Sequence, residues 1–213
     1  SAHVDPIKID SNGLYVQKSG SRLFELSIAN DRAAIDYGGV DLTQLVPEVG
    51  EPSIVRTAVQ RQPDTRVHCI RSDGVAAVLI FDRTENTLCW CEVETDGLIE
   101  DVVVLPGTTE DAVYYVVNRT INGATKRYVE KWALQSECIG GATNKLADSH
   151  VTYSGAAATV ITGLSHLEGE QVAVWANGAD VGTATSTGSS WTFTHTVSGG
   201  QITADGLVEL KRR

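Results

Sequence analysis

The segment YYVVNRTINGATKRYVEKW, residues 114–132, decides the fold because it has the pattern of one complete β-hairpin. Its two arms are rich in Val, Thr and Tyr and alternate between apolar and polar residues, which is typical of half-buried strands. Between the arms lies Asn122-Gly123, a dipeptide that tolerates the positive φ angles of a two-residue hairpin turn. The segment therefore predicts two antiparallel strands joined by a tight turn.

The rest of the chain repeats this pattern. Short segments rich in Val, Ile, Thr and aromatic residues follow one another at roughly the 8–12-residue spacing of all-β folds. Many are separated by turn dipeptides, with Asn-Gly beginning at residues 12, 122 and 177 and Asp-Gly at 73, 96 and 205. The main helix signal is DLTQLVPEV, where we expect Asp41 to cap a short turn that Pro47 ends. The sequence thus predicts an all-β fold.

Two domains are expected. Between Arg56 and Trp132 the strand segments fall into two sets with the spacing of β-propeller blades, and so few blades cannot close a ring. Residues 136–150 are small and polar, as in a linker or domain edge. We predict an incomplete, propeller-like region of antiparallel strands at residues 1–138. A small β-sandwich or barrel, rich in Gly, Ala, Ser and Thr, is predicted at residues 139–213.

Composition restricts the functional class. The 213 residues carry a formal net charge of -10 that is spread along the chain, which argues against a protein that holds nucleic acid by neutralising phosphates. Because no apolar run is long enough to cross a bilayer, no membrane segment is predicted. The chain contains no methionine and opens with SAHVDP, so we expect a fragment of a longer protein.

The cysteines do not predict a metal site or a disulfide. The spacing of the four cysteines fits no zinc pattern. Cys89 and Cys91 point to the same side of one predicted strand, where a disulfide between them would be strained. A metal site that uses His68 or Cys69 is the less favoured alternative to reduced cysteines acting as small hydrophobic strand residues.

No catalytic or cofactor site is predicted either, and we expect no enzyme activity. Carboxylates are plentiful, as in ETDGLIED at residues 94–101, but the sequence assigns no pair of them to one cleft. His166 and His195 have no candidate partner at a characteristic spacing.

Three surface features have competing interpretations. Asn118-Arg119-Thr120 satisfies the glycosylation sequon, but ordinary strand residues beside a hairpin also explain it. The basic residues Lys126, Arg127 and Lys131 suit an acidic partner, or a strand edge that charges protect from pairing.

Trp175 and Trp191, in the second predicted domain, are candidate residues for stacking on a sugar ring. Cross-strand packing in the core is the competing interpretation of these two tryptophans, and the one that we favour.

Five segments occur in an order that indicates a family. They are LYVQKSGSRLFELSI, GGVDLTQLVPEV, QRQPDTRVHCIRSDGVAAVLIFDRTENTLCWCEVETDG, VYYVVNRTINGATKRYVEKW and TYSGAAATVITGLSHLEGEQVAVWANG. Together they resemble the C-terminal portion of phage tail nozzle, or tail tubular protein B-like, virion proteins, over most of residues 13–178. The long N-terminal region of that family is lacking, and QITADGLVELKRR replaces an aromatic ending, so the role of the last strand is left open.

The resemblance implies a structural role in the virion of a phage or prophage. It implies a homo-oligomeric ring of the full-length protein in the tail or at the head–tail junction, in contact with other tail or connector proteins. DNA would pass through this ring without specific binding. Residues 114–132 would be a scaffold hairpin, and no catalytic or cofactor residue carries over. Two alternatives are a tail module that binds glycans or the host surface, and a hydrolase of cell-wall or capsule sugars.

Overall fold

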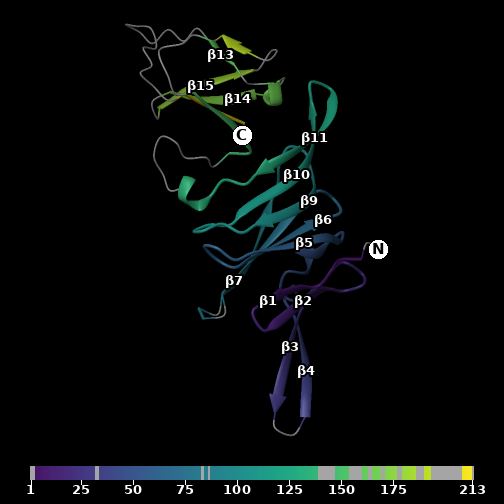
Figure 1. Cartoon of the computed structure of the whole chain (residues 1–213). Helices are drawn as coiled ribbons and strands as arrows, with labels where there is room; N and C mark the ends of the chain where they lie inside the picture. Colours follow the sequence, from purple (N-terminus) through teal and green to yellow (C-terminus); the bar gives the residue numbers. More distant parts are fainter. Residues whose placement is uncertain are drawn as a thin grey trace. The chain divides into compact units, whose positions relative to one another are not determined.

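The computed structural model is all-β, as the sequence predicts (Figure 1). It describes residues 3–31, 34–82, 84–85, 87–138, 147–153, 160–162, 165–168, 171–176, 179–185, 190–192 and 208–212. Within these ranges the only helices are three short 3-10 segments, Pro47–Gly50, Gln135–Glu137 and Ser165–Leu167. None of the described helices has the length and apolar character needed to cross a membrane.

The chain forms two compact units. The first comprises Ser1–Arg119 and Arg127–Trp132, and the second comprises Thr120–Lys126 and Ala133–Arg213. The tip of the hairpin around Asn122 therefore belongs to the second unit, where the Asn122 side-chain amide donates a hydrogen bond to Glu168 at 3.2 Å. The domain boundary at residues 138 and 139 stays a prediction.

Three antiparallel sheets, each made of consecutive strands, build the first unit. Sheet 1 contains β1 (Ile7–Ile9), β2 (Asn12–Val16), β3 (Leu23–Asp31) and β4 (Ala34–Asp41). Sheet 2 contains β5 (Ile54–Gln60), β6 (Arg66–Arg71), β7 (Ala76–Asp82) and β8 (Thr87–Val93). Sheet 3 contains β9 (Leu98–Leu105), β10 (Ala112–Ile121) and β11 (Ala124–Lys131), in the order β11-β10-β9.

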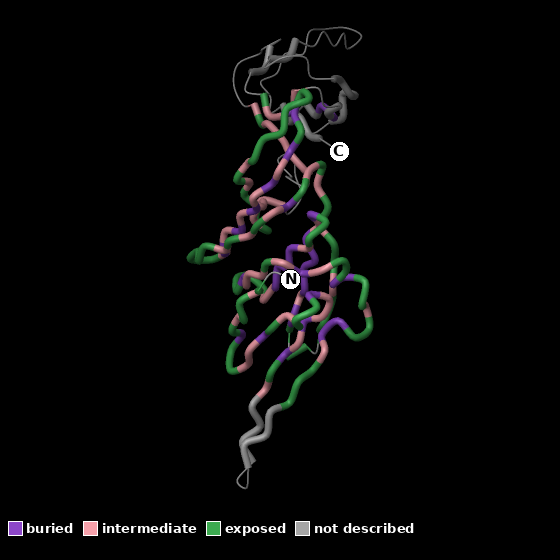
Figure 2. Tube along the Cα trace, turned by 90° about the vertical axis from the view of Figure 1, so that its right-hand side faces the viewer, coloured by how far each residue is buried: buried purple, intermediate pink, exposed green. Residues whose placement is uncertain are grey.

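Sheet 2 packs against sheets 1 and 3, and its middle strands β6 and β7 are buried on both faces. Residues 67–70 of β6 are all buried although successive side chains of a strand point to opposite faces. On one face β6 and β7 form an apolar cluster with Leu14 and Leu23 of sheet 1. On the other face they form a second cluster with Ile99 and Val113 of sheet 3. Figure 2 shows these buried residues concentrated in the middle of the first unit. Consecutive antiparallel sheets stacked in this way resemble propeller blades.

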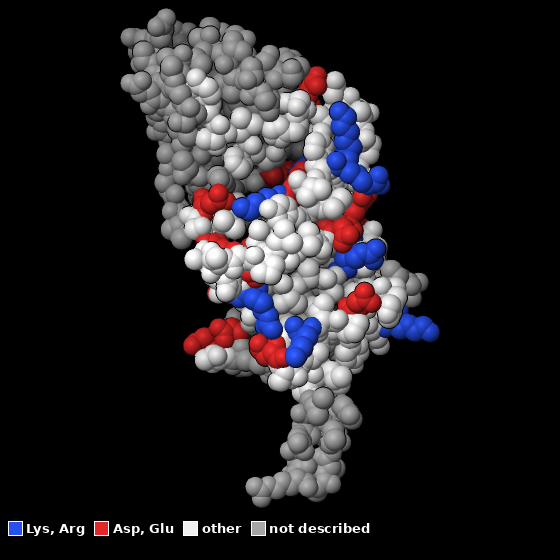
Figure 3. Space-filling view, in the orientation of Figure 1, with Lys and Arg blue, Asp and Glu red and all other residues white. Residues whose placement is uncertain are grey.

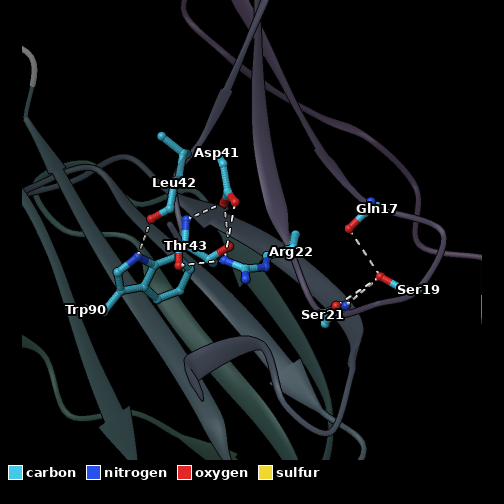
Figure 4. Close-up of polar contacts among 8 residues, drawn as sticks. All are labelled: Gln17, Ser19, Ser21, Arg22, Asp41, Leu42, Thr43 and Trp90. Carbon is cyan, nitrogen blue, oxygen red and sulfur yellow. Dashed lines mark hydrogen bonds and ion pairs between the residues drawn. The ribbon is translucent and has the colours of Figure 1, made fainter. Parts of the chain in front are cut away.

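Polar contacts fix the root of the β3–β4 hairpin, and one of them reaches sheet 2 (Figure 4). The indole Nε1 of Trp90, on β8, donates a hydrogen bond to the backbone carbonyl of Leu42 at 2.9 Å. One carboxylate oxygen of Asp41 accepts hydrogen bonds from the backbone N–H and the hydroxyl of Thr43, at 2.8 and 2.6 Å. Arg22 reaches the other oxygen at 3.3 Å. These contacts fix the chain where it leaves sheet 1, so Trp90 is a structural residue.

The second unit contains two smaller antiparallel sheets. The larger has the order β12-β17-β14-β15, from Ser149–Tyr153, Val208–Arg212, Gln171–Ala176 and Ala179–Thr185. The smaller pairs β13 (Val160–Thr162) with β16 (Ser190–Thr192). The last strand, β17, lies between β12 and β14 and bonds to both. The ending of the sequence, whose role the resemblance leaves open, therefore supplies a central strand.

Candidate assembly surface

The outer face of sheet 3, turned away from sheet 2, carries exposed apolar side chains. The inner face of β10 presents Val113, Tyr115 and Val117 to sheet 2, so the alternate residues of the strand point outward. Val103 lies opposite the outward Tyr114. Val103 is 48% exposed, and on the same side Leu105 is 51% and Val129 72% exposed. An apolar face at the end of a stack of sheets is the kind of surface that another protein surface covers.

Two opposite charges on this outer face are paired with each other. Arg127 of β11 donates two hydrogen bonds to Glu100 of β9, at 2.6 and 3.2 Å. The amide of Asn118, on β10 between them, donates a third to Glu100 at 3.0 Å. The hydrogen bond from Arg127 is the main reason that the pKa of Glu100 is lowered, and the pKa of Arg127 is raised in return. The face therefore combines exposed apolar side chains with one ion pair that bridges its three strands, and the exposed Lys131 adds a further charge.

A closed polar network lies on the inner face of sheet 3, between it and sheet 2. His68 is fully buried, with Nδ1 2.7 Å from the Tyr115 hydroxyl and Nε2 3.2 Å from the side-chain oxygen of Gln60. The Gln60 amide nitrogen donates to the backbone carbonyl of Gln62 at 2.8 Å, so its oxygen faces the ring. His68 Nε2 then carries the proton, and Nδ1 accepts the Tyr115 O–H.

Burial controls the pKa values in this network. It lowers the pKa of His68 to about 4, with a further contribution from the positive charge of Arg66. It also raises the pKa of Tyr115, and it raises the pKa of the buried Cys69 thiol to about 12. At neutral pH the three groups are uncharged and have the ordinary role of satisfied polar groups in a core.

Arg119, which the sequence indicates only as a strand residue within the sequon, is an internal cation. It is 3% exposed. Its guanidinium holds both oxygens of Glu130, at 2.5 and 2.7 Å, and donates to the backbone carbonyl of Asp96 at 2.8 Å. The bidentate pair joins β10 to β11 and satisfies a charge that would otherwise be costly to bury. The three sequon residues all lie on β10, and the Asn118 amide bonds Glu100 on the outer face of the sheet.

Asp111 ties the β9–β10 loop of sheet 3 to the β5–β6 loop of sheet 2. Its carboxylate accepts hydrogen bonds from the backbone N–H groups of Arg61, Gln62 and Gly107, at 2.6, 3.0 and 3.2 Å. Burial alone would raise its pKa, but the three backbone donors favour the ionised form and the pKa is lowered. The residue is a structural acceptor.

A surface pocket of about 530 Å³ beside the β7–β8 turn gathers four carboxylates. Asp10 is bonded to Arg61 at 3.2 Å, and Asp64 to Arg66 at 3.0 Å. Asp82 accepts two backbone N–H groups of the turn that follows it. Three of the four acids therefore have structural partners. In the part of the chain that the structure describes, no group of three or more His, Cys, Asp or Glu side chains is arranged to hold a metal ion.

The other predicted residues do not converge on one site. Trp175 lies on β14 opposite Glu209, and Trp191 lies on β16 opposite Ile161, so the backbone places the two candidate sugar-stacking residues in different sheets. His166 lies in the 3-10 helix Ser165–Leu167 of the second unit.

His195 falls outside the described residues. The four cysteines are free thiols. Cys89 and Cys91 are exposed on β8, the edge strand of sheet 2.

Comparison of the sequence with models of protein families finds no match, and comparison with curated proteins finds no relative.

Proposed function

We propose that the chain is a structural part of a phage or prophage tail, or of a head–tail junction, and that it contributes to a ring or nozzle through which DNA passes. The observation that carries the proposal is the apolar outer face of sheet 3, with Val103, Leu105 and Val129 about half exposed or more. Covering such a face in contact with another subunit would be favourable at about 25 cal/mol per Å² of apolar surface buried.

Two further properties support a passive wall. Sheet 2 is clamped between two apolar layers, and it is bonded to sheet 3 through Asp111 and to the chain leaving sheet 1 through the Trp90–Leu42 hydrogen bond. Such a body deforms little because its interior is close-packed. The net charge of -10 would repel DNA phosphates, so a genome would slide past such a wall without binding to it.

Electron microscopy and mass photometry of the full-length protein, alone and with neighbouring tail proteins, test the proposal. The informative variant is Val103→Glu with Val129→Glu, because both side chains are exposed and charge there disturbs the apolar face more than the fold. Leu45→Glu is the matched control, since Leu45 is 92% exposed in a loop away from sheet 3.

We expect rings, or incorporation into tails, for the wild type and the control, and loss of both for the double variant. Rings that form equally well with the double variant would show that this face is not the contact. The absence of any ring or tail association in the wild type would refute the proposed function itself.

A further inference from the structure

The free edge of β11 offers a second interaction surface, distinct from the outer face of sheet 3. Sheets 1 and 2 have four strands each, whereas sheet 3 has three, and β11 is its last strand. No described strand pairs with the far side of β11. An eight-residue edge of this kind presents unpaired N–H and C=O groups, which are a template for another strand.

The turn of the hairpin determines which backbone groups point to this edge. Asn122 and Gly123 both have positive φ, 49° and 72°, as in a two-residue type I′ turn. The residues that flank such a turn form a hydrogen-bonded pair, and the pairing then alternates along the strands. Because the Trp132 N–H donates to Val113 O at 2.8 Å, the even-numbered residues of β11 bond to β10. The backbone groups of the odd-numbered residues, from Thr125 to Lys131, therefore point to the free edge.

Charge selects one way in which β11 can pair with another copy of itself. A two-fold axis through residue 127 would place Arg127 opposite Arg127, and an axis through residue 129 would place Arg127 opposite Lys131. Both arrangements are repulsive, since like charges directly opposite destabilise a strand pair. An axis through Tyr128 places Lys126 of each copy opposite Glu130 of the other and brings the two Tyr128 side chains together.

Accessibility and hydrogen bonding agree with the same register. The axis through Tyr128 makes residues 127 and 129 a hydrogen-bonded pair between copies, which uses the groups that face the edge. Glu130 is already held by Arg119, but its side chain is 31% exposed and remains accessible to a second cation. Figure 3 shows Lys and Arg side chains gathered over the β10–β11 hairpin, where an opposing carboxylate would be favoured. Val129, 72% exposed, would lose solvent contact against the Arg127 stem of the other copy.

We propose that two copies of this chain associate through antiparallel pairing of β11 with β11, centred on Tyr128, to form one continuous six-stranded sheet. The inference rests on the geometry of the strand and not on the proposed function, because a two-fold contact joins two copies and closes no ring. A single strand pair buries less than the roughly 1,200 Å² of a standard stable interface, so the association is weak. We expect a dissociation constant of about 1 μM to 1 mM.

Disulfide trapping tests the register. Residues directly opposite in a non-hydrogen-bonded antiparallel pair have Cα atoms about 4.5 Å apart, within the range that a disulfide spans. In a background in which Cys89, Cys91 and Cys138 are replaced by serine, Tyr128→Cys should form a covalent dimer in a glutathione redox buffer. Val129→Cys is the control, because residue 129 lies opposite residue 127 and not opposite itself.

Two measurements on variants and wild type keep the proposal testable if Tyr128→Cys folds poorly. Sedimentation velocity should give concentration-dependent dimers that Lys126→Glu weakens at least tenfold, whereas Lys18→Glu, with the same charge change in an exposed turn, has no effect. Hydrogen exchange of the wild type should slow with concentration at the odd-numbered amides from Thr125 to Lys131, while the even-numbered amides stay protected throughout.

Two results together would overturn the proposal. The protein would stay monomeric at every concentration up to about 1 mM, which covers the range of weak association, and the edge amides would exchange at a rate that does not depend on concentration. Dimers that link through Val129→Cys and not through Tyr128→Cys would also overturn it, because the register would be wrong. Dimers that are indifferent to Lys126→Glu and show no change in edge exchange would place the contact on another surface.

Discussion

Acidification from neutral pH to about pH 4 is expected to destabilise the first unit through His68. The pKa of this residue in the folded chain is about 4, against an ordinary value of 6.5, because burial and the charge of Arg66 oppose protonation. The unfolded chain exposes the ring and binds a proton below about pH 6.5, whereas the folded chain binds it only near pH 4. Since the unfolded state binds more protons across this window, the free energy of unfolding falls as the pH falls through it.

The magnitude follows from the same two pKa values. Their difference, 6.5 minus about 4, at about 1.36 kcal/mol for each unit, gives a loss of about 3 kcal/mol by the lower end of the window. A marginally stable domain has only about 5–15 kcal/mol in total, so the loss is a large fraction of its stability. Above pH 6.5 both states hold a neutral ring and the contribution of His68 does not change with pH.

Urea unfolding at a series of pH values measures this effect. The ring of Trp132 lies 5.0 Å from that of His68, centroid to centroid, so tryptophan fluorescence reports on the region. His68→Gln is the comparison variant, because its amide keeps hydrogen-bonding capacity but does not titrate. We expect the variant to be less stable at neutral pH and to lose about 3 kcal/mol less than the wild type on acidification. Parallel pH profiles of the two proteins would refute the reasoning, since the remaining groups titrate in both.

Three further changes have expected outcomes in chemical denaturation. Arg119→Met should cost about 3–5 kcal/mol, because it leaves Glu130 without its bidentate partner; a cost below about 1 kcal/mol, the value of a surface pair, would contradict the buried-pair assignment. Gly74→Ala should destabilise the fold strongly, since φ is +86° and a Cβ would lie 2.7–2.9 Å from atoms of β9. Gly123→Ala, where φ is +72° but no atom lies within 4 Å of the added Cβ, should cost only about 1 kcal/mol. Equal costs for the two variants would contradict the steric argument. Asp111→Asn should cost about 1–3 kcal/mol. Because the pKa of Asp111 is lowered, the wild type should lose this advantage as pH falls below the ordinary value of 3.8. Below that pH the variant should therefore lose less stability than the wild type, and parallel pH profiles of the two proteins would contradict the assignment.

Local features could be predicted from the sequence because they depend on residues close together in the chain. The Asn122-Gly123 turn has the positive φ values that its residue types indicate, and burial alternates along β10. At DLTQLVPEV the expectation is met, because Asp41 accepts two hydrogen bonds from Thr43 and the turn at residues 42–45 ends before Pro47. Pro47 begins a 3-10 helix, because proline fits the first turn of a helix, where its missing N–H needs no partner.

Features that depend on distant residues could not be predicted. His68 and Tyr115 are 47 positions apart and meet only because sheet 3 packs on sheet 2. The alternation in β10 indicated that Arg119 and Asn118 face opposite sides, but not which side is buried. That choice depends on Val113 and Val117, whose face is covered by sheet 2. One signal was available, since Glu130 follows at a position of the hairpin that faces the same side as Arg119, and a carboxylate there can pair with a buried guanidinium.

The edge of β11 shows how pairing changes the meaning of a charge pattern. Read along the chain, Lys126, Arg127, Glu130 and Lys131 indicate an edge that charges protect from association. In the structure Arg127 is engaged by Glu100 and Glu130 by Arg119, so the charge of each of these two residues is partly balanced within the sheet. A protected edge needs charges that remain unpaired and face an incoming strand. For β11, protection from pairing with another strand therefore depends mainly on the charges of Lys126 and Lys131. A partner strand that places a carboxylate opposite Lys126 neutralises one of these two charges.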